Sequence, residues 1–411
     1  MSKFLLCFCV IISSGVFGQE IKNLTTITSD FQGLPATKWK FATKAPVIAS
    51  AVMDEDMVYF GSLDSVLYAL DTETGNMRWQ LKTGAGIRST VLIENSQLFL
   101  NGGDGIFYAI NKKTGKVLWT YKTGGEHTYQ YYGYADYYHS SPVLYKDKIC
   151  FGSGDSYIYV LNASTGKLSW RFKTGDVVHA TPVINGDKLF VGSFDGYLYA
   201  LNAGSGDLIW KFKSVGQRFF PKGEMQGSPV IANNLVYIGS RDYNIYAIDI
   251  EKGYCHWNKP FPLGWVMALS ARDSLIYAGT SDDDVMVSMD GKTGKENWRT
   301  NVQFNIFGHA VFSNSLMYFG TLMGRLHALD LKTGEIKWTF KTDGYLSNQK
   351  EFFPDENKVV KNDFYAYVKS PEGYIAALYQ LGAIFSKPAI SENLIILSST
   401  DGKVYCLSRK Y

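Results

Sequence analysis

The sequence predicts an all-β protein, an eight-bladed β-propeller whose blades are four-stranded antiparallel sheets. A glycine that precedes a tryptophan by four residues recurs seven times along the chain, which indicates a repeated structural unit. The repeats follow one another at a spacing of about 40 residues, which is typical of a four-stranded propeller blade. Each end of the chain carries part of a further repeat, and the two parts together complete an eighth blade.

Residues 1–18 are set apart from the repeats and have the pattern of a cleavable export signal. Lys3 provides a positive start, residues 4–12 form an apolar run, and Gly18 ends a small-residue cleavage site. The run is too short to cross a bilayer as a permanent helix, and no later segment is apolar for long enough to do so. We therefore expect a soluble mature chain of residues 19–411 in the periplasm or outside the cell, with no transmembrane segment.

Residues 192–210 show the pattern of one repeat. Apolar and polar residues alternate through Tyr197–Leu201, as in a half-buried strand, and Asp195 and Gly196 mark a tight turn before it. Trp210 begins a fourth, outer strand, where a large ring is expected to wedge between neighbouring sheets. Eight tryptophans are assigned this structural role: Trp39, Trp79, Trp119, Trp170, Trp210, Trp257, Trp298 and Trp338.

The first strand of a repeat is marked by a Ser-Pro-Val segment such as residues 228–230. Proline cannot donate to a ladder, so this strand is expected at the edge that faces the central channel. From the position of this valine to the tryptophan is 27 residues in six repeats. The interval from Ser270 to Trp298 is 28 residues, and we expect the extra residue at 281–284, as a bulge or a longer turn.

The two incomplete repeats predict how the ring closes. The last repeat ends after Leu407 without an outer strand, whereas the strand around Trp39 has no blade before it. We expect this N-terminal strand to pair with the C-terminal blade, because closure protects the sheet edges.

The alternation of Ser-x-Pro-Val, Gly-Ser-x-Asp-Gly-x-Leu-Tyr-Ala-Leu-Asn and Thr-Gly-x-x-x-Trp resembles the pyrroloquinoline-quinone (PQQ) type propeller repeat. The resemblance covers nearly all of the mature chain. That family includes quinoprotein dehydrogenases and non-enzymatic scaffolds, among them the propeller lipoprotein of the outer-membrane β-barrel assembly machine. The resemblance implies a fold, and a fold alone does not assign a function.

Three insertions interrupt the regular spacing, near residues 124–138, 214–226 and 343–381. Each lies between an outer strand and the next inner strand, so all three are expected on the face that carries the Gly-Ser-x-Asp-Gly turns. Their aromatic residues are the predicted binding residues, and the third insertion is long enough for a hairpin or a lid. We single out Tyr131, Tyr132 and Tyr134 in the first insertion, Phe219 and Phe220 in the second, and Phe352 and Phe353 in the third. The tyrosines either form a wall for a sugar, an aromatic ligand or a partner protein, or pack on each other and plug the channel.

The register also predicts which side chains ring the channel beneath these insertions. Four of the predicted ring positions are polar and lie on consecutive blades: Arg88, His139, His179 and Gln226. The other four are apolar: Ile48, Val266, Phe307 and Phe385. A half-polar mouth suits an amphiphilic or planar ligand. In the alternative interpretation the polar residues only bond loop carbonyls or water.

We expect an exported, monomeric, non-enzymatic propeller that binds a protein or glycan partner through the insertion face. The net charge of +3 is spread along the chain, which disfavours a nucleic-acid partner. No catalytic motif and no Cys/His metal spacing is present, so neither a catalytic residue nor a bound metal or cofactor is expected. Two alternatives stay open: a quinoprotein-like oxidoreductase that holds PQQ and calcium over Arg88, His139 and His179, and an outer-membrane protein assembly scaffold.

Overall fold

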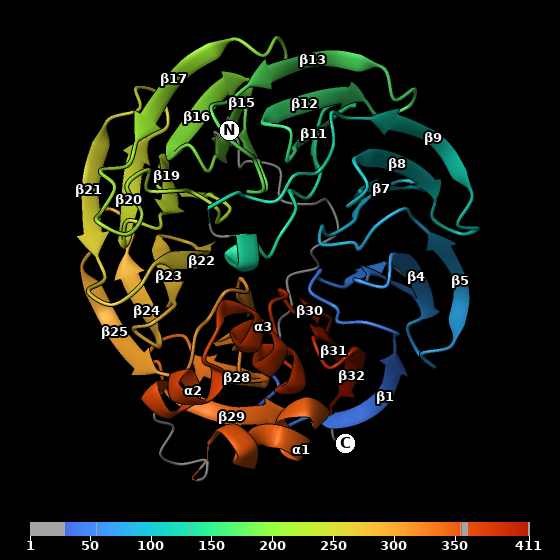
Figure 1. The fold of residues 1–411 in the computed structure, drawn as a ribbon, viewed down its shortest axis with the longest axis vertical. Coiled ribbons are helices and arrows are strands. Elements are labelled where there is room, and N and C mark those ends of the chain that lie inside the picture. Colours follow the sequence, from blue (N-terminus) through green and yellow to red (C-terminus); the bar gives the residue numbers. More distant parts are fainter. Residues whose placement is uncertain (1–28, 55, 132, 354, 356–360, 410–411) are drawn as a thin grey trace, which may run out of the picture.

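The computed structural model describes residues 29–409, except 55, 132, 354 and 356–360, and it forms the predicted eight-bladed propeller (Figure 1). The predicted export signal at residues 1–18 lies outside this described part. No helix among the described residues is long and apolar enough to cross a membrane.

Seven blades are continuous in sequence, and each consists of four antiparallel strands that follow one another from the inner edge of the sheet to the outer edge. The first blade contains β2 (Val52–Asp54), β3 (Met57–Gly61), β4 (Val66–Asp71) and β5 (Met77–Lys82). The second contains β6 (Leu92–Glu94), β7 (Gln97–Asn101), β8 (Ile106–Asn111) and β9 (Val117–Lys122). The third contains β10 (Val143–Tyr145), β11 (Lys148–Gly152), β12 (Tyr157–Asn162) and β13 (Leu168–Lys173). The next two are β14 (Val183–Asn185), β15 (Lys188–Gly192), β16 (Tyr197–Asn202) and β17 (Leu208–Lys213); and β18 (Val230–Ala232), β19 (Leu235–Gly239), β20 (Asn244–Asp249) and β21 (Cys255–Pro260). The last two are β22 (Val266–Arg272), β23 (Leu275–Thr280), β24 (Val285–Asp290) and β25 (Glu296–Asn301); and β26 (Val311–Phe312), β27 (Leu316–Gly320), β28 (Arg325–Asp330) and β29 (Ile336–Lys341).

The eighth blade joins the two ends of the chain. Its order is β1 (Ala36–Ala42), β32 (Lys403–Ser408), β31 (Leu394–Ser399) and β30 (Ala389–Ile390). The outer strand β1 pairs antiparallel with β32, with Trp39 opposite Cys406. The predicted closure of the ring by the N-terminal strand is confirmed.

The repeated tryptophans wedge between blades. Trp170, for example, donates from its indole Nε1 to the carbonyl of Ala203 in the next blade at 3.1 Å. Its ring lies against Gly206, where a Cβ would come within 2.7 Å of the indole. The same glycine has φ +83°, so it is required both for the left-handed turn and for the close approach of the ring.

In the repeats that carry it, the aspartate of the turn joins the hairpin to the loop that enters the same blade. Asp195 accepts a hydrogen bond from the Tyr199 hydroxyl at 2.6 Å and one from the backbone N–H of Gly175 at 2.7 Å. Because Gly175 belongs to the loop between β13 and β14, the turns and these loops share one face, as predicted.

The extra residue of the β22–β25 blade lies in the turn between β23 and β24. Gly192 pairs with Leu198 across the corresponding turn of a regular blade, whereas Gly279 pairs with Met286. The turn is therefore one residue longer, which is one of the two predicted solutions.

The insertions add helices to one face of the propeller. The first contains the 3-10 helix η1 (Gly133–Ala135), which lies at the centre of the ring, and the third contains α1 (Asp343–Phe352), α2 (Lys361–Val368) and α3 (Pro371–Gln380) (Figure 1). The side chains of Thr342 and Ser370 cap α1 and α3 at their N-termini. The third insertion is thus a helical cover over one sector of the ring.

Candidate functional site

The first insertion enters the mouth of the channel and fills its apolar half. The ring of Tyr137 lies against Phe307 and Phe385, with centroid separations of 5.4 and 4.9 Å. The Tyr138 hydroxyl donates to the backbone carbonyls of Phe307 and Phe385 at 3.2 and 2.9 Å. Tyr137 is 3% exposed. Tyr137 and Tyr138 therefore plug the channel mouth, which is one of the two predicted arrangements of the tyrosines.

Arg88 of the polar half of the ring and Arg241 of a turn between two strands hold the same loop by its backbone. Arg88 Nη1 donates to the carbonyls of Asp136 and Tyr137 at 3.3 and 3.2 Å. Arg241 Nη2 donates to the carbonyl of Ala135 at 2.9 Å and to Gln226 Oε1 at 2.7 Å. The loop is therefore tied to blades that are distant in sequence.

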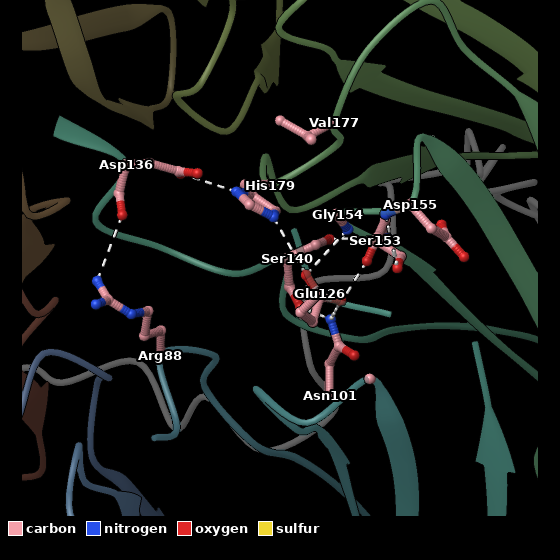
Figure 2. A network of polar contacts seen from close by, with 12 residues as sticks. Arg88, Asn101, Glu126, Asp136, Ser140, Ser153, Gly154, Asp155, Val177 and His179 are labelled. Atoms are coloured by element: carbon pink, nitrogen blue, oxygen red, sulfur yellow. Dashed lines mark hydrogen bonds and ion pairs between the residues drawn. The ribbon is translucent and has the colours of Figure 1, made fainter. Parts of the chain in front are cut away.

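Two buried carboxylates face the imidazole of His179 (Figure 2). His179 Nδ1 lies 2.8 Å from Asp136 Oδ1, and His179 Nε2 lies 3.2 Å from Glu126 Oε2. Glu126 Oε2 also accepts a hydrogen bond from the backbone N–H of Gly154 at 2.9 Å, and Asn101 Nδ2 approaches Glu126 Oε1 at 3.4 Å. The side chains of His179, Glu126 and Asp136 are at most 2% exposed.

This arrangement sets the charges of the cluster. Burial opposes ionisation of both carboxylates, but the charge and hydrogen bonds of His179 hold the pKa of Glu126 and that of Asp136 below their ordinary values. Burial also disfavours the charged form of His179, but Asp136 and Glu126 raise its pKa to about 10. At neutral pH His179 is therefore an imidazolium between two carboxylates.

His139 completes the cluster without being bonded into it. Its ring centroid lies 5.1 Å from that of His179, and burial lowers its pKa to about 4, so it is neutral. Its Nδ1 is buried with no hydrogen-bond partner within the described part of the chain. Potential ligand atoms of Glu126, His139 and His179 all lie within 4.8 Å of one another, so these three residues could hold a metal ion.

An aromatic cleft of about 440 Å³ opens beside this plug. All three insertions and the neighbouring blades contribute to its lining, which includes Ala135, Tyr137, Phe220, Trp265, Asp282, Asn305, Phe307, Tyr365, Lys369 and Tyr374. Phe220 stacks on Trp265 at 5.3 Å and 23°, and Tyr365 stacks on Tyr374 at 6.1 Å and 24°. Asn305 Oδ1 is buried with no hydrogen-bond partner in the described residues. The cleft thus offers flat apolar surfaces with a few polar atoms, which is typical of a ligand site.

The other predicted binding residues divide into exposed and buried ones. Tyr131 and Phe219 are 60% and 61% exposed, and neither lines the cleft. Phe352 and Phe353 lie in the core, where both rings pack against Phe364 of α2. Tyr132 and the side chain of Tyr134 fall outside the described part.

Sequence reasoning missed Arg241 and Asp282, although both stand at one repeat position. They occupy the variable position of the Gly-Ser-x-Asp-Gly turn, where the other repeats carry uncharged residues. Arg241 is 1% exposed, and its guanidinium lies 4.3 Å from the centre of the Trp265 ring. Asp282 accepts a hydrogen bond from the Tyr365 hydroxyl at 2.6 Å. Charge at an otherwise uncharged repeat position is the pattern that identifies both.

The mouth does not fit PQQ with calcium over Arg88, His139 and His179. That position is taken by Asp136 and Tyr137, which contact Arg88 and His179. The carboxylates of Glu126 and Asp136 are separated by the imidazole of His179, so they do not form the all-oxygen shell that calcium prefers.

A known family matches most of the chain. The sequence profile of the family described as outer membrane protein assembly factor BamB, a PQQ-type repeat family, matches residues 35–170, 136–263 and 194–344. No curated protein sequence matches the chain.

Solved structures with low sequence identity share the fold. BamB from Moraxella catarrhalis is 15% identical with a TM-score of 0.67, over 91% of this chain and 100% of that one. The computationally designed Ika8 protein is 16% identical with a TM-score of 0.68, over 92% of this chain and 100% of that one. The quinohemoprotein alcohol dehydrogenase from Comamonas testosteroni is 13% identical with a TM-score of 0.67, over 92% of this chain and 76% of that one. These likenesses establish the propeller and leave the activity open.

Proposed function

This chain belongs to the PQQ-type repeat family described as outer membrane protein assembly factor BamB, and we propose that it is an exported, non-enzymatic propeller that binds a protein partner. The observation that carries the proposal is the aromatic cleft at the meeting point of the three insertions. The inserted residues depart from the regular repeat, so the fold itself does not require them.

The chemistry of the cleft favours an extended protein segment with aromatic or aliphatic side chains. Stacked rings such as Phe220 on Trp265 provide apolar surface, and aromatic residues are the common anchors of protein interfaces. Lys369 and Asp282 add a charge of each sign to the lining, and Asn305 adds a buried acceptor. These groups can bond the backbone of a bound segment while its side chains contact the rings.

A glycan is the second ligand class that such a cleft can take, because sugars also stack on aromatic rings. We favour a protein because the solved structure of BamB covers nearly the whole of this chain and the matching family is described as an assembly factor. An assembly-scaffold role is the narrower form of the same proposal.

The test measures peptide binding with matched cleft variants. Labelled peptides in which aromatic and polar residues alternate are titrated with the full-length chain, and fluorescence anisotropy gives the dissociation constant. Tyr365→Ala and Phe220→Ala remove cleft surface, and Tyr254→Ala removes an exposed tyrosine next to β21, away from the cleft.

We expect each cleft variant to bind at least about tenfold more weakly than the wild type, while Tyr254→Ala binds equally well. No peptide binding, or binding that survives both cleft substitutions, would overturn the proposal. If oligosaccharides bind with this dependence and peptides do not, the cleft is a glycan site and the protein-partner proposal is wrong.

A further inference from the structure

We propose that Glu126, His139 and His179 form a binding site for one divalent transition-metal ion such as Zn²⁺. Glu126 comes from the first insertion, His139 from the segment between this insertion and β10, and His179 from the loop before β14. One potential ligand atom of each lies within 4.8 Å of those of the other two. The aromatic cleft plays no part in this inference, which therefore stands or falls independently of the proposed partner.

The spacing of the ligand atoms suits a small ion. In a tetrahedral zinc site with bonds of about 2.0–2.1 Å, neighbouring ligand atoms lie roughly 3.3 Å apart. His179 Nε2 and Glu126 Oε2 are 3.2 Å apart, which is already the separation that a shared ion requires. One potential ligand atom of His139 lies within 4.8 Å of one such atom of each of the other two residues, so all three side chains can approach a common ion.

The groups around the ligands are those that orient a metal site. His179 Nδ1, the nitrogen away from Glu126, bonds to Asp136 Oδ1 at 2.8 Å (Figure 2). A carboxylate on the second nitrogen of a histidine is the common partner of metal-ligating imidazoles, because it fixes the ring and raises its basicity. Glu126 is held in turn by the backbone N–H of Gly154.

His139 is the ligand whose chemistry is otherwise unused. Its buried Nδ1 has no hydrogen-bond partner within the described part of the chain. A buried polar atom without a partner is costly, and a bound ion would satisfy it.

The ligand types select the class of ion. Two imidazoles and one carboxylate suit zinc and other late first-row ions, whereas calcium and magnesium prefer shells of oxygen. Three protein ligands leave a fourth position for water or for a group of a partner. Without an ion, the cluster is simply an imidazolium held between two carboxylates, and that is the alternative to be tested.

The experiment uses the full-length chain after dialysis against a chelator. Zn²⁺ is titrated by calorimetry, Ca²⁺ is titrated in parallel, and Co²⁺ is added to report geometry through its visible spectrum. His139→Ala removes a proposed ligand whose buried Nδ1 makes no hydrogen bond within the described residues. His127→Ala removes an exposed histidine of the first insertion as a matched control. Circular dichroism verifies that both variants are folded.

We expect one equivalent of Zn²⁺ to bind the wild type and the His127→Ala variant, with Ca²⁺ giving no heat at the same concentrations. The His139→Ala variant should bind Zn²⁺ at least about tenfold more weakly. Less than one equivalent in the wild type, or unchanged affinity in His139→Ala, would overturn the proposal. If His139→Ala fails to fold, the cobalt spectrum of the wild type decides: intense four-coordinate bands support the site, and only the weak bands of hydrated cobalt refute it.

Discussion

At the scale of one residue, Gly206 shows why a glycine precedes the tryptophan of each repeat by four residues. Two features of Gly206 disfavour a side chain there: its φ of +83° and its contact with the Trp170 ring. Gly186 has only the first feature, because its φ is +56° and no atom lies within 4 Å of the position that a Cβ would occupy. Gly186→Ala should lower the free energy of unfolding by about 1–2 kcal/mol, the cost of a left-handed alanine. Gly206→Ala should lower it by a further 1–3 kcal/mol or so, because its Cβ would press on the indole. Urea unfolding midpoints measure the difference, and equal losses would show that the ring contact has no effect.

The buried side chain of His327 should make the stability of the fold depend on pH. It is 3% exposed, its Nδ1 contacts Thr339 Oγ1 at 2.9 Å, and burial together with the nearby charge of Arg325 lowers its pKa from 6.5 to about 3. The unfolded chain binds a proton at this residue as the pH falls through about 6.5, whereas the folded chain does not until about pH 3. The folded state is therefore fully favoured above pH 6.5 and loses stability as the pH falls below it, by on the order of 2 kcal/mol at pH 5.

His327→Gln removes this titration while keeping a group that can bond Thr339. We expect the variant to lose less stability than the wild type between pH 7 and pH 5, as measured by urea unfolding at each pH. His256→Gln on the exposed face of β21 is the control and should follow the wild type. Parallel curves for His327→Gln and the wild type would contradict the assignment.

At the scale of one element, the first insertion is held in the mouth by a small number of buried hydrogen bonds. Tyr138→Phe removes the two that reach the carbonyls of Phe307 and Phe385 and leaves those carbonyls without this donor. The cost should be about 1–3 kcal/mol, and it should favour local opening of the loop. Limited proteolysis within residues 129–138 should therefore be roughly tenfold faster or more. Tyr131→Phe, at an exposed position of the same loop, should be cleaved at the wild-type rate.

Structure within the repeats can be predicted from the sequence, whereas structure within the insertions cannot. Ring positions such as Arg88 and His179 follow from the register, because each repeat places the same position at the same point of the channel. Glu126 has no equivalent in the other repeats, so its contact with His179 depends on the path of an insertion that the register does not determine. The three helices of the third insertion were not predicted either, although Ser370 followed by Pro371 is a typical helix start.

For the molecule as a whole, the closing blade depends on the N-terminal segment as well as on β1. Seven tryptophans donate to a carbonyl of the turn in the following blade, but Trp338 has no such turn ahead of it and donates to the carbonyl of Phe31 instead. Asp30 accepts hydrogen bonds from Ser313 and Ser315 of the preceding blade. The segment before β1 thus completes the eighth interface between blades.

The double substitution Asp30→Ala, Phe31→Ala therefore tests whether this segment closes the ring. Phe31 is 2% exposed, and its ring packs against Tyr318 and the guanidinium of Arg409. Losing its buried surface should cost about 3–5 kcal/mol, and losing the Asp30 bonds should add to this. Urea unfolding should show a lower midpoint, with the greatest increase in hydrogen exchange in β1 and β32 because these strands form the seam. Leu34→Ala, an exposed neighbour in the same segment, should leave both measurements unchanged. An equal effect from this control would mean that Asp30 and Phe31 contribute nothing specific to closure.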